Sequence, residues 1–149
     1  MGLALLFPGQ GSQFVGMGQD FALNFNVANQ VFRDLDDTLG RQLSKIAFEG
    51  NIEELTLTTN SQPAIMAHSV AILESIKDQN LFNLNNVTAV AGHSLGEYSA
   101  LVATKSISFK SATQLLEVRS KAMQDSMPIG TGGMAAIIGK SMKEVEEII

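Results

Sequence analysis

Two short runs of consecutive apolar residues interrupt the otherwise mixed pattern of the chain. The first covers residues 3–7 and is stopped by Pro8 and Gly9, and the second covers residues 87–91. A short apolar run that ends in turn residues predicts a buried strand, and we expect the first strand to lie in a parallel sheet covered on both faces. A third run, over 134–138, predicts another strand.

Elsewhere, apolar residues recur every three or four positions, which predicts helices. The clearest example has an apolar stripe over 27–39, with Asn26 as its predicted cap and Gly40 as its stop. Further helices are predicted over 16–23 and 95–103, and others open at Asn51, at 61–63, at Ser108 and at Ser141, the last of them still running at Ile149.

Strands that alternate with helices predict an α/β fold with a mainly parallel sheet. The sharpest change of composition is the segment 128–133, Pro-Ile-Gly-Thr-Gly-Gly, which predicts a flexible linker. We therefore expect one domain over residues 1–127 and the start of a second, smaller domain in residues 128–149. Because the last predicted helix is still running at Ile149, we also expect a chain that is cut short.

Composition removes several classes of function. The net charge of −5 argues against nucleic acid as the main partner. The sequence has no cysteine, which excludes disulfides, thiolate catalysis and cysteine-based metal sites and fits a reducing compartment. No apolar stretch is long enough to cross a bilayer, and the N-terminus lacks the basic region of a signal peptide. We expect a cytoplasmic protein with no membrane partner.

The strongest candidate for chemistry is the pentapeptide Gly92-His93-Ser94-Leu95-Gly96, which joins a predicted strand to a predicted helix. A Gly-x-Ser-x-Gly sequence at a sharp strand-to-helix turn exposes the serine hydroxyl as a nucleophile. The pentapeptide alone can arise by chance in a chain rich in glycine and serine, so its position carries the argument. At the helix start, the backbone N–H of Leu95 would face a developing oxyanion.

The sequence offers no obvious base for Ser94. Adjacent residues on a sharp turn point apart, so His93 is expected to support the loop rather than take the Ser94 proton. His68 falls inside a predicted helix, and a structural role is expected for it.

Two other segments have both a structural and a functional interpretation. The glycine-rich loop that includes Gln10 lacks the third glycine of a dinucleotide fingerprint and the lysine of a P-loop. It is either an ordinary turn or the source of a second backbone N–H for an oxyanion hole. Arg119 is either a surface arginine whose stem packs on its helix or a clamp for a substrate carboxylate, and the residues alone favour the surface role.

Taken together, several separated motifs resemble the malonyl-CoA:acyl-carrier-protein transacylases. The motifs are Phe7-Pro8-Gly9-Gln10-Gly11-Ser12-Gln13, Gln62-Pro63-Ala64, the segment from Gly92 to Leu101, Arg119, and the segment from Gly130 to Gly139. The resemblance runs over the whole chain, and several motifs in the right order are far more specific than any one of them.

The resemblance implies a role for each candidate residue. Ser94 would attack the malonyl thioester of coenzyme A, and the backbone N–H groups of Gln10 and Leu95 would form the oxyanion hole. Arg119 would pair with the free malonyl carboxylate, with Gln62 lining the pocket, and His93 would sit near the substrate. The phosphopantetheine thiol of acyl carrier protein would then take the malonyl group, in fatty acid biosynthesis, with no cofactor or metal.

The resemblance also implies a fold and a gap. The family fold has an α/β-hydrolase-like large domain and a ferredoxin-like small domain, and this chain would supply the first part of the former with only the first strand and helix of the latter. The family's catalytic histidine would lie beyond this chain, so we expect the 149 residues alone to be nearly inactive and poorly stable. The alternatives are a serine acyltransferase or hydrolase of other acyl specificity, and an inactive fragment that binds a carrier protein.

Overall fold

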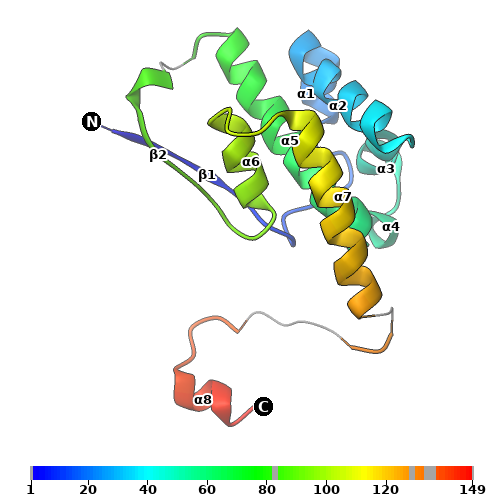
Figure 1. Ribbon diagram of the computed structural model, residues 1–149, viewed down its shortest axis with the longest axis vertical. Coiled ribbons are helices and arrows are strands. Elements are labelled where there is room, and N and C mark those ends of the chain that lie inside the picture. Colours follow the sequence, from blue (N-terminus) through cyan, green and yellow to red (C-terminus); the bar gives the residue numbers. More distant parts are fainter. Residues whose placement is uncertain (1, 82–83, 128–129, 133–136, 149) are drawn as a thin grey trace.

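The structure, a computed structural model, describes residues 2–81, 84–127, 130–132 and 137–148 (Figure 1). Its helices and strands alternate as an α/β fold, which confirms the predicted class. In chain order the elements are β1 (Leu3–Phe7), α1 (Gln19–Asn24), α2 (Asn26–Leu39), α3 (Leu43–Glu49), α4 (Ile52–Thr56), α5 (Thr58–Asp78), the 3-10 turn η1 (Leu84–Asn86), β2 (Val87–Gly92), α6 (Gly96–Ala103), α7 (Phe109–Ser126) and α8 (Met142–Glu146).

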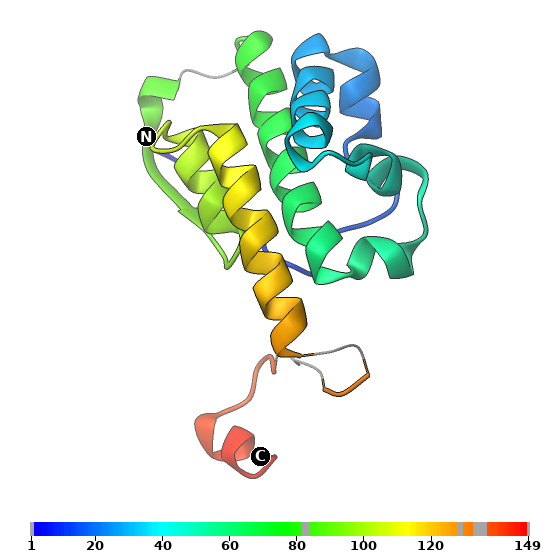
Figure 2. The ribbon, with the colours of Figure 1, turned by 45° about the vertical axis from the view of Figure 1, so that its right-hand side comes forward.

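Helix α5 is the centre of the molecule. It packs against α2, α6 and α7, which surround it in Figures 1 and 2, and α2 and α7 also contact each other. Most of its residues are buried on every side, which is typical of a core helix. Leu35 of α2, Ile65 of α5 and Leu116 of α7 meet in the main apolar core.

Pro63 lies inside α5, whereas the sequence predicted it for the first turn. The helix begins earlier, at Thr58, so the missing N–H of Pro63 leaves the carbonyl of Thr59 without its usual helical partner. The Arg41 side chain takes that place, with Nη2 donating to Thr59 O at 2.9 Å and Nη1 donating to Asn60 Oδ1 at 2.7 Å. A distant arginine therefore makes an early proline tolerable in the central helix.

Replacing Arg41 with methionine should lower the free energy of unfolding by about 2 kcal/mol, because the Thr59 carbonyl and the Asn60 amide lose a charged donor in a half-buried place. Urea denaturation followed by circular dichroism measures the change. The matched control is Arg33→Met on exposed α2 surface, which should change stability by less than about 0.5 kcal/mol. Equal losses in the two variants would contradict the role given to Arg41.

The two described strands form a parallel pair with Leu5 opposite Val90 and Leu6 opposite Ala91. On one face, Phe7 packs against Leu73 of α5 and Ala100 of α6. The other face is open, because Leu6 is 77% exposed and the neighbouring alanines of both strands are exposed too. The prediction of a strand covered on both faces was therefore wrong, since the packed helices of the described chain lie on one side only.

The helix ends confirm several local predictions and correct two. Gly40 ends α2 with a left-handed φ of 65°, and the side chains of Asn51, Ser108 and Ser141 each accept a hydrogen bond from a backbone N–H in the first turn of the helix that follows. Asn26, however, is the first residue of α2 and not its cap. Helix α8 ends at Glu146, so the expectation of a helix still running at Ile149 was wrong.

The C-terminal segment stands apart from the helical body. Helix α8 lies beyond the end of α7 in both ribbon views (Figures 1 and 2). The predicted strand over 134–138 falls mostly on residues 133–136, which lie outside the described residues. The domain boundary after residue 127 stays a prediction. Among the described residues, no helix is both long and apolar enough to cross a membrane.

Candidate active site

Ser94 occupies a sharp turn between β2 and α6, as the sequence predicted. Its φ is 55°, a left-handed conformation that costs a residue with a side chain about 1 kcal/mol. The residue is exposed, while Leu95 beside it is fully buried in the main core. A strained, exposed serine anchored by a buried neighbour has the geometry of a nucleophile elbow.

Two glycines make this turn possible by close packing. A side-chain carbon on Gly92 would collide with the carbonyl of Gly96, and one on Gly96 would collide with the carbonyl of Phe7. The start of α6 therefore lies directly on the end of β1. The His93 N–H also donates to Phe7 O at 3.0 Å. These contacts bring the loop after β1, with Gln10, beside the Ser94 turn.

The first turn of α6 leaves one backbone donor available at the elbow. The N–H groups of Gly96 and Glu97 donate to the carbonyls of His93 and Ser94, at 2.9 and 3.2 Å. In the described part of the chain, no carbonyl accepts the N–H of Leu95 or that of exposed Gln10. The absence of a carbonyl partner is compatible with the predicted oxyanion hole, although the role of both groups there stays a prediction.

Arg119 joins the predicted site residues into one cluster. Its Nη1 donates to Gln62 Oε1 at 2.5 Å, and its Nη2 donates to Ser94 Oγ at 3.1 Å. The residues alone had favoured a surface arginine, whereas the side chain is half-buried and its guanidinium is directed at Ser94. The structure thus brings together Ser94 of the turn between β2 and α6, Gln62 of α5 and Arg119 of α7, which are far apart in sequence.

Met123 belongs to the same cluster and was missed by the sequence analysis. Gln62 is 1% exposed, and its Nε2 donates to Met123 Sδ at 3.3 Å while its Oε1 accepts from Arg119. The position of Met123, four residues after Arg119 on one helix, was the available signal, because such residues share a face. Both ends of the buried amide are satisfied.

Neither histidine is paired with Ser94 among the described residues. The exposed His93 lies with its ring beside Gly9 of the loop after β1. His68 lies on α5 against the rings of Phe14 and Phe21, and its buried Nδ1 has no hydrogen-bond partner there. Burial lowers the pKa of His68, so its neutral form is favoured. The structural role predicted for His68 agrees with these contacts, and the substrate-binding role of His93 stays a prediction.

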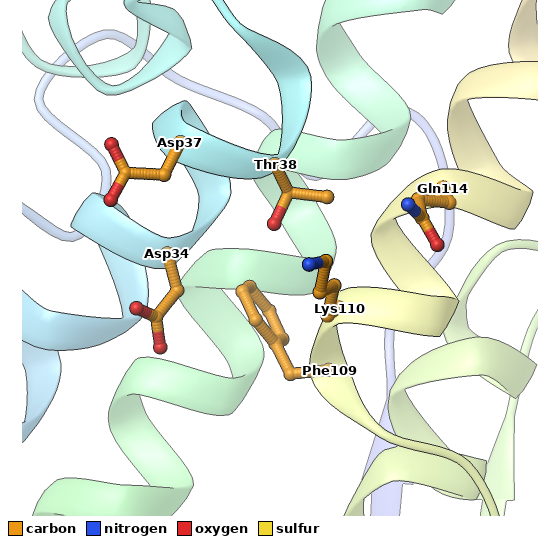
Figure 3. Close-up of a pocket in the computed structure, with 6 residues that line it drawn as sticks. All are labelled: Asp34, Asp37, Thr38, Phe109, Lys110 and Gln114. Atoms are coloured by element: carbon orange, nitrogen blue, oxygen red, sulfur yellow. The ribbon is translucent and has the colours of Figure 1, made fainter.

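Two hollows are lined by residues of the described chain. A cavity of about 500 Å³ lies between α2 and the start of α7, lined by Asp34, Asp37 and Thr38 from α2 and by Phe109, Lys110 and Gln114 from α7 (Figure 3). A shallower groove of about 340 Å³ runs along β2 and α6 and reaches Gly92. No cluster of metal-ligating side chains occurs in the ranges that the structure describes.

A model of the family described as "Acyl transferase domain" matches residues 4–148. The chain belongs to the acyl transferase domain family. The chain is 44% identical over 146 residues to a malonyl CoA-acyl carrier protein transacylase of Bacillus subtilis, and the match covers 98% of it. It is 46% identical over 136 residues, or 91% of the chain, to the protein of the same name from Haemophilus influenzae.

Solved structures give the same result. The chain superimposes over 99% of its length on an acyl-carrier-protein-S-malonyltransferase from Bartonella henselae, with a TM-score of 0.91 and 49% identity. A malonyl-transacylase solved in complex with its type II PKS acyl-carrier protein matches 99% of the chain with a TM-score of 0.88 and 43% identity.

The chain spans less than half the length of these proteins. It covers 45% of the Bacillus subtilis relative, 43% of the Haemophilus influenzae relative and 47% of each of the two solved chains. The match therefore includes the Ser94 elbow, the glycine-rich loop with Gln10, and helix α7 with Arg119. More than half of each relative has no counterpart in these 149 residues.

Proposed function

We propose that this acyl transferase moves a malonyl group from malonyl-CoA to the phosphopantetheine thiol of acyl carrier protein, through a malonyl ester on Ser94. The observation that supports it most directly is the guanidinium of Arg119, held by buried Gln62 within hydrogen-bond distance of Ser94 Oγ. A cation at that place suits an acyl group that ends in a carboxylate. We place the reaction in fatty acid biosynthesis in the cytoplasm, without a cofactor.

The reaction has two half-reactions at one serine. Ser94 Oγ attacks the thioester carbon, and the oxyanion forms near the N–H groups of Gln10 and Leu95. The carbon–sulfur bond then breaks, and coenzyme A leaves as its thiol with the serine proton. The carrier-protein thiol attacks the ester in the same way and restores the serine hydroxyl. One covalent intermediate shared by two substrates gives ping-pong kinetics.

A general base completes the proposal. A serine hydroxyl is a weak nucleophile at neutral pH, and a positioned base contributes about 10²- to 10⁴-fold. Because neither histidine of the described chain is paired with Ser94, we assign the base to the part of the family fold that has no counterpart in these 149 residues. Ser94 esterification by this chain is therefore slow and best followed as a single stoichiometric event.

The test compares malonyl-CoA with acetyl-CoA as donors. We expect an adduct of one malonyl group per chain, located on Ser94 by peptide mass spectrometry. Arg119→Met should slow its formation by about 100-fold, because the carboxylate loses its charged partner, and should not slow acetylation. The matched control Arg33→Met changes an exposed arginine outside the site and should react like the unchanged protein.

Three outcomes would contradict the proposal. An adduct on another residue would remove Ser94 as the nucleophile. Equal slowing of malonyl and acetyl transfer by Arg119→Met would favour the alternatives, a hydrolase or acyltransferase for uncharged groups. Failure to form any adduct, with carrier protein still bound in a pull-down, would favour the inactive carrier-binding fragment.

A further inference from the structure

Arg119 makes a contact that a carboxylate clamp does not need. One end of its guanidinium is held by Gln62, and the other end donates to the oxygen that is to attack the thioester, at 3.1 Å. A hydrogen bond to Ser94 Oγ engages a lone pair of the nucleophile. It also holds the hydroxyl beside the positive charge, so the contact restrains Ser94 as well as preparing a place for substrate.

The guanidinium is held by its Gln62 end. Gln62 is almost fully buried, and its amide nitrogen is engaged by Met123 Sδ, so its carbonyl oxygen faces Arg119. An amide turned the other way would place N–H groups against the N–H groups of the guanidinium, which is repulsive. Exchange of partners is therefore easier at the Nη2 end, which faces the exposed Ser94.

We propose that Arg119 is a substrate-released lock on Ser94. A carboxylate accepts a hydrogen bond from a guanidinium more strongly than a neutral hydroxyl does, because the bond joins opposite charges. When an acyl group with a free carboxylate arrives, Nη2 exchanges Ser94 Oγ for that carboxylate, and the freed hydroxyl becomes the better nucleophile. An acyl group without a carboxylate leaves the lock closed.

This lock makes Arg119 determine specificity twice, once by binding the carboxylate and once by releasing the nucleophile. The inference rests on the proposed function for the identity of the natural carboxylate. The lock itself is a property of the Arg119–Ser94 contact, so it is measured with reagents that are not substrates.

The test uses methanesulfonyl fluoride, a small neutral reagent for serine hydroxyls. Its sulfur bonds to Ser94 Oγ while the S–F bond breaks, and the hydroxyl proton leaves with fluoride. The rate of labelling of Ser94 is followed by mass spectrometry on the 149-residue chain. We expect Arg119→Met to react about 3- to 10-fold faster than the unchanged protein, as expected for the loss of one restraining hydrogen bond. Arg33→Met should react at the unchanged rate.

Acetate provides the second arm, because it is the smallest probe that offers a carboxylate to Arg119. Added acetate should accelerate labelling of the unchanged protein severalfold and leave Arg119→Met unaffected. Sodium chloride at the same ionic strength is the control for screening. This arm also keeps the inference testable if the Arg119 variant fails to fold.

The outcomes separate the lock from the proposed function. The lock is overturned if Arg119→Met is labelled no faster than the unchanged protein. It is also overturned if acetate fails to accelerate labelling of the unchanged protein. A lock confirmed by both arms in a protein that never forms a malonyl adduct would stand while the proposed function fails. A malonyl adduct without either rate effect would support the proposed function and overturn the lock.

Discussion

Replacing Ser94 with alanine should abolish the malonyl adduct, with a decrease in the rate of its formation of at least about 10³-fold. Ser94 Oγ is the exposed hydroxyl at the elbow and the acceptor of Arg119. The turn 92–96 holds no other hydroxyl or thiol, and the alanine variant keeps the same backbone. Intact mass spectrometry after incubation with malonyl-CoA gives the occupancy of the ester directly.

Two companion variants show whether the loss belongs to the hydroxyl. Ser106→Ala removes an exposed serine that contacts Thr104, away from the elbow, and should leave adduct formation unchanged. Ser94→Gly should abolish the adduct and raise the free energy of unfolding by about 1 kcal/mol, because glycine relieves the positive φ. Persistent adduct in Ser94→Ala would mean that another residue carries the malonyl group.

The elbow was predictable from sequence because its determinants are local. An apolar run, a glycine, an exposed serine and a second glycine follow one another within residues 87–96, and the structure places them as strand, turn and helix. The same holds for the left-handed Gly40 and for the caps at Asn51, Ser108 and Ser141. Each depends on hydrogen bonds or dihedral angles within one turn of chain.

Features set by distant parts of the chain were not predictable in this way. Pro63 was placed at a helix start by its own preference, but a donor from Arg41 lets the helix begin earlier. The residues alone favoured a surface position for Arg119, and only the family resemblance suggested a role in the site. In the structure, Arg119 contacts Gln62 and Ser94. Periodicity shows which face a residue occupies, and not which partner meets it there.

The open sheet face is a third example. A purely apolar strand predicts cover on both sides, since parallel sheets are normally buried. In the described chain, the helices that pack on the strands lie on one side, and Leu6 stays 77% exposed. The apolar composition of the strand therefore does not show on which side helices pack. The expectation of low stability follows from the same exposed surface.

Replacing Gly92 with alanine should lower the free energy of unfolding by about 3 kcal/mol or more. The new methyl group would meet the backbone carbonyl of Gly96, which cannot move by rotating a side chain, so β2 and α6 must separate. That separation would also displace Ser94 from Arg119 and reduce malonyl adduct formation in the protein that remains folded. Urea denaturation and adduct occupancy measure the two effects.

The control for this variant is Gly40→Ala at the end of α2. Gly40 has a φ of 65° and no heavy atom within 4 Å of an added methyl group, so its replacement costs only the backbone strain of about 1 kcal/mol. The difference between the two variants isolates the collision at the elbow from the general cost of replacing a glycine. If Gly92→Ala were no more destabilising than Gly40→Ala, the start of α6 would not be packed against the end of β2. The close approach that aims Ser94 at Arg119 would then need another cause.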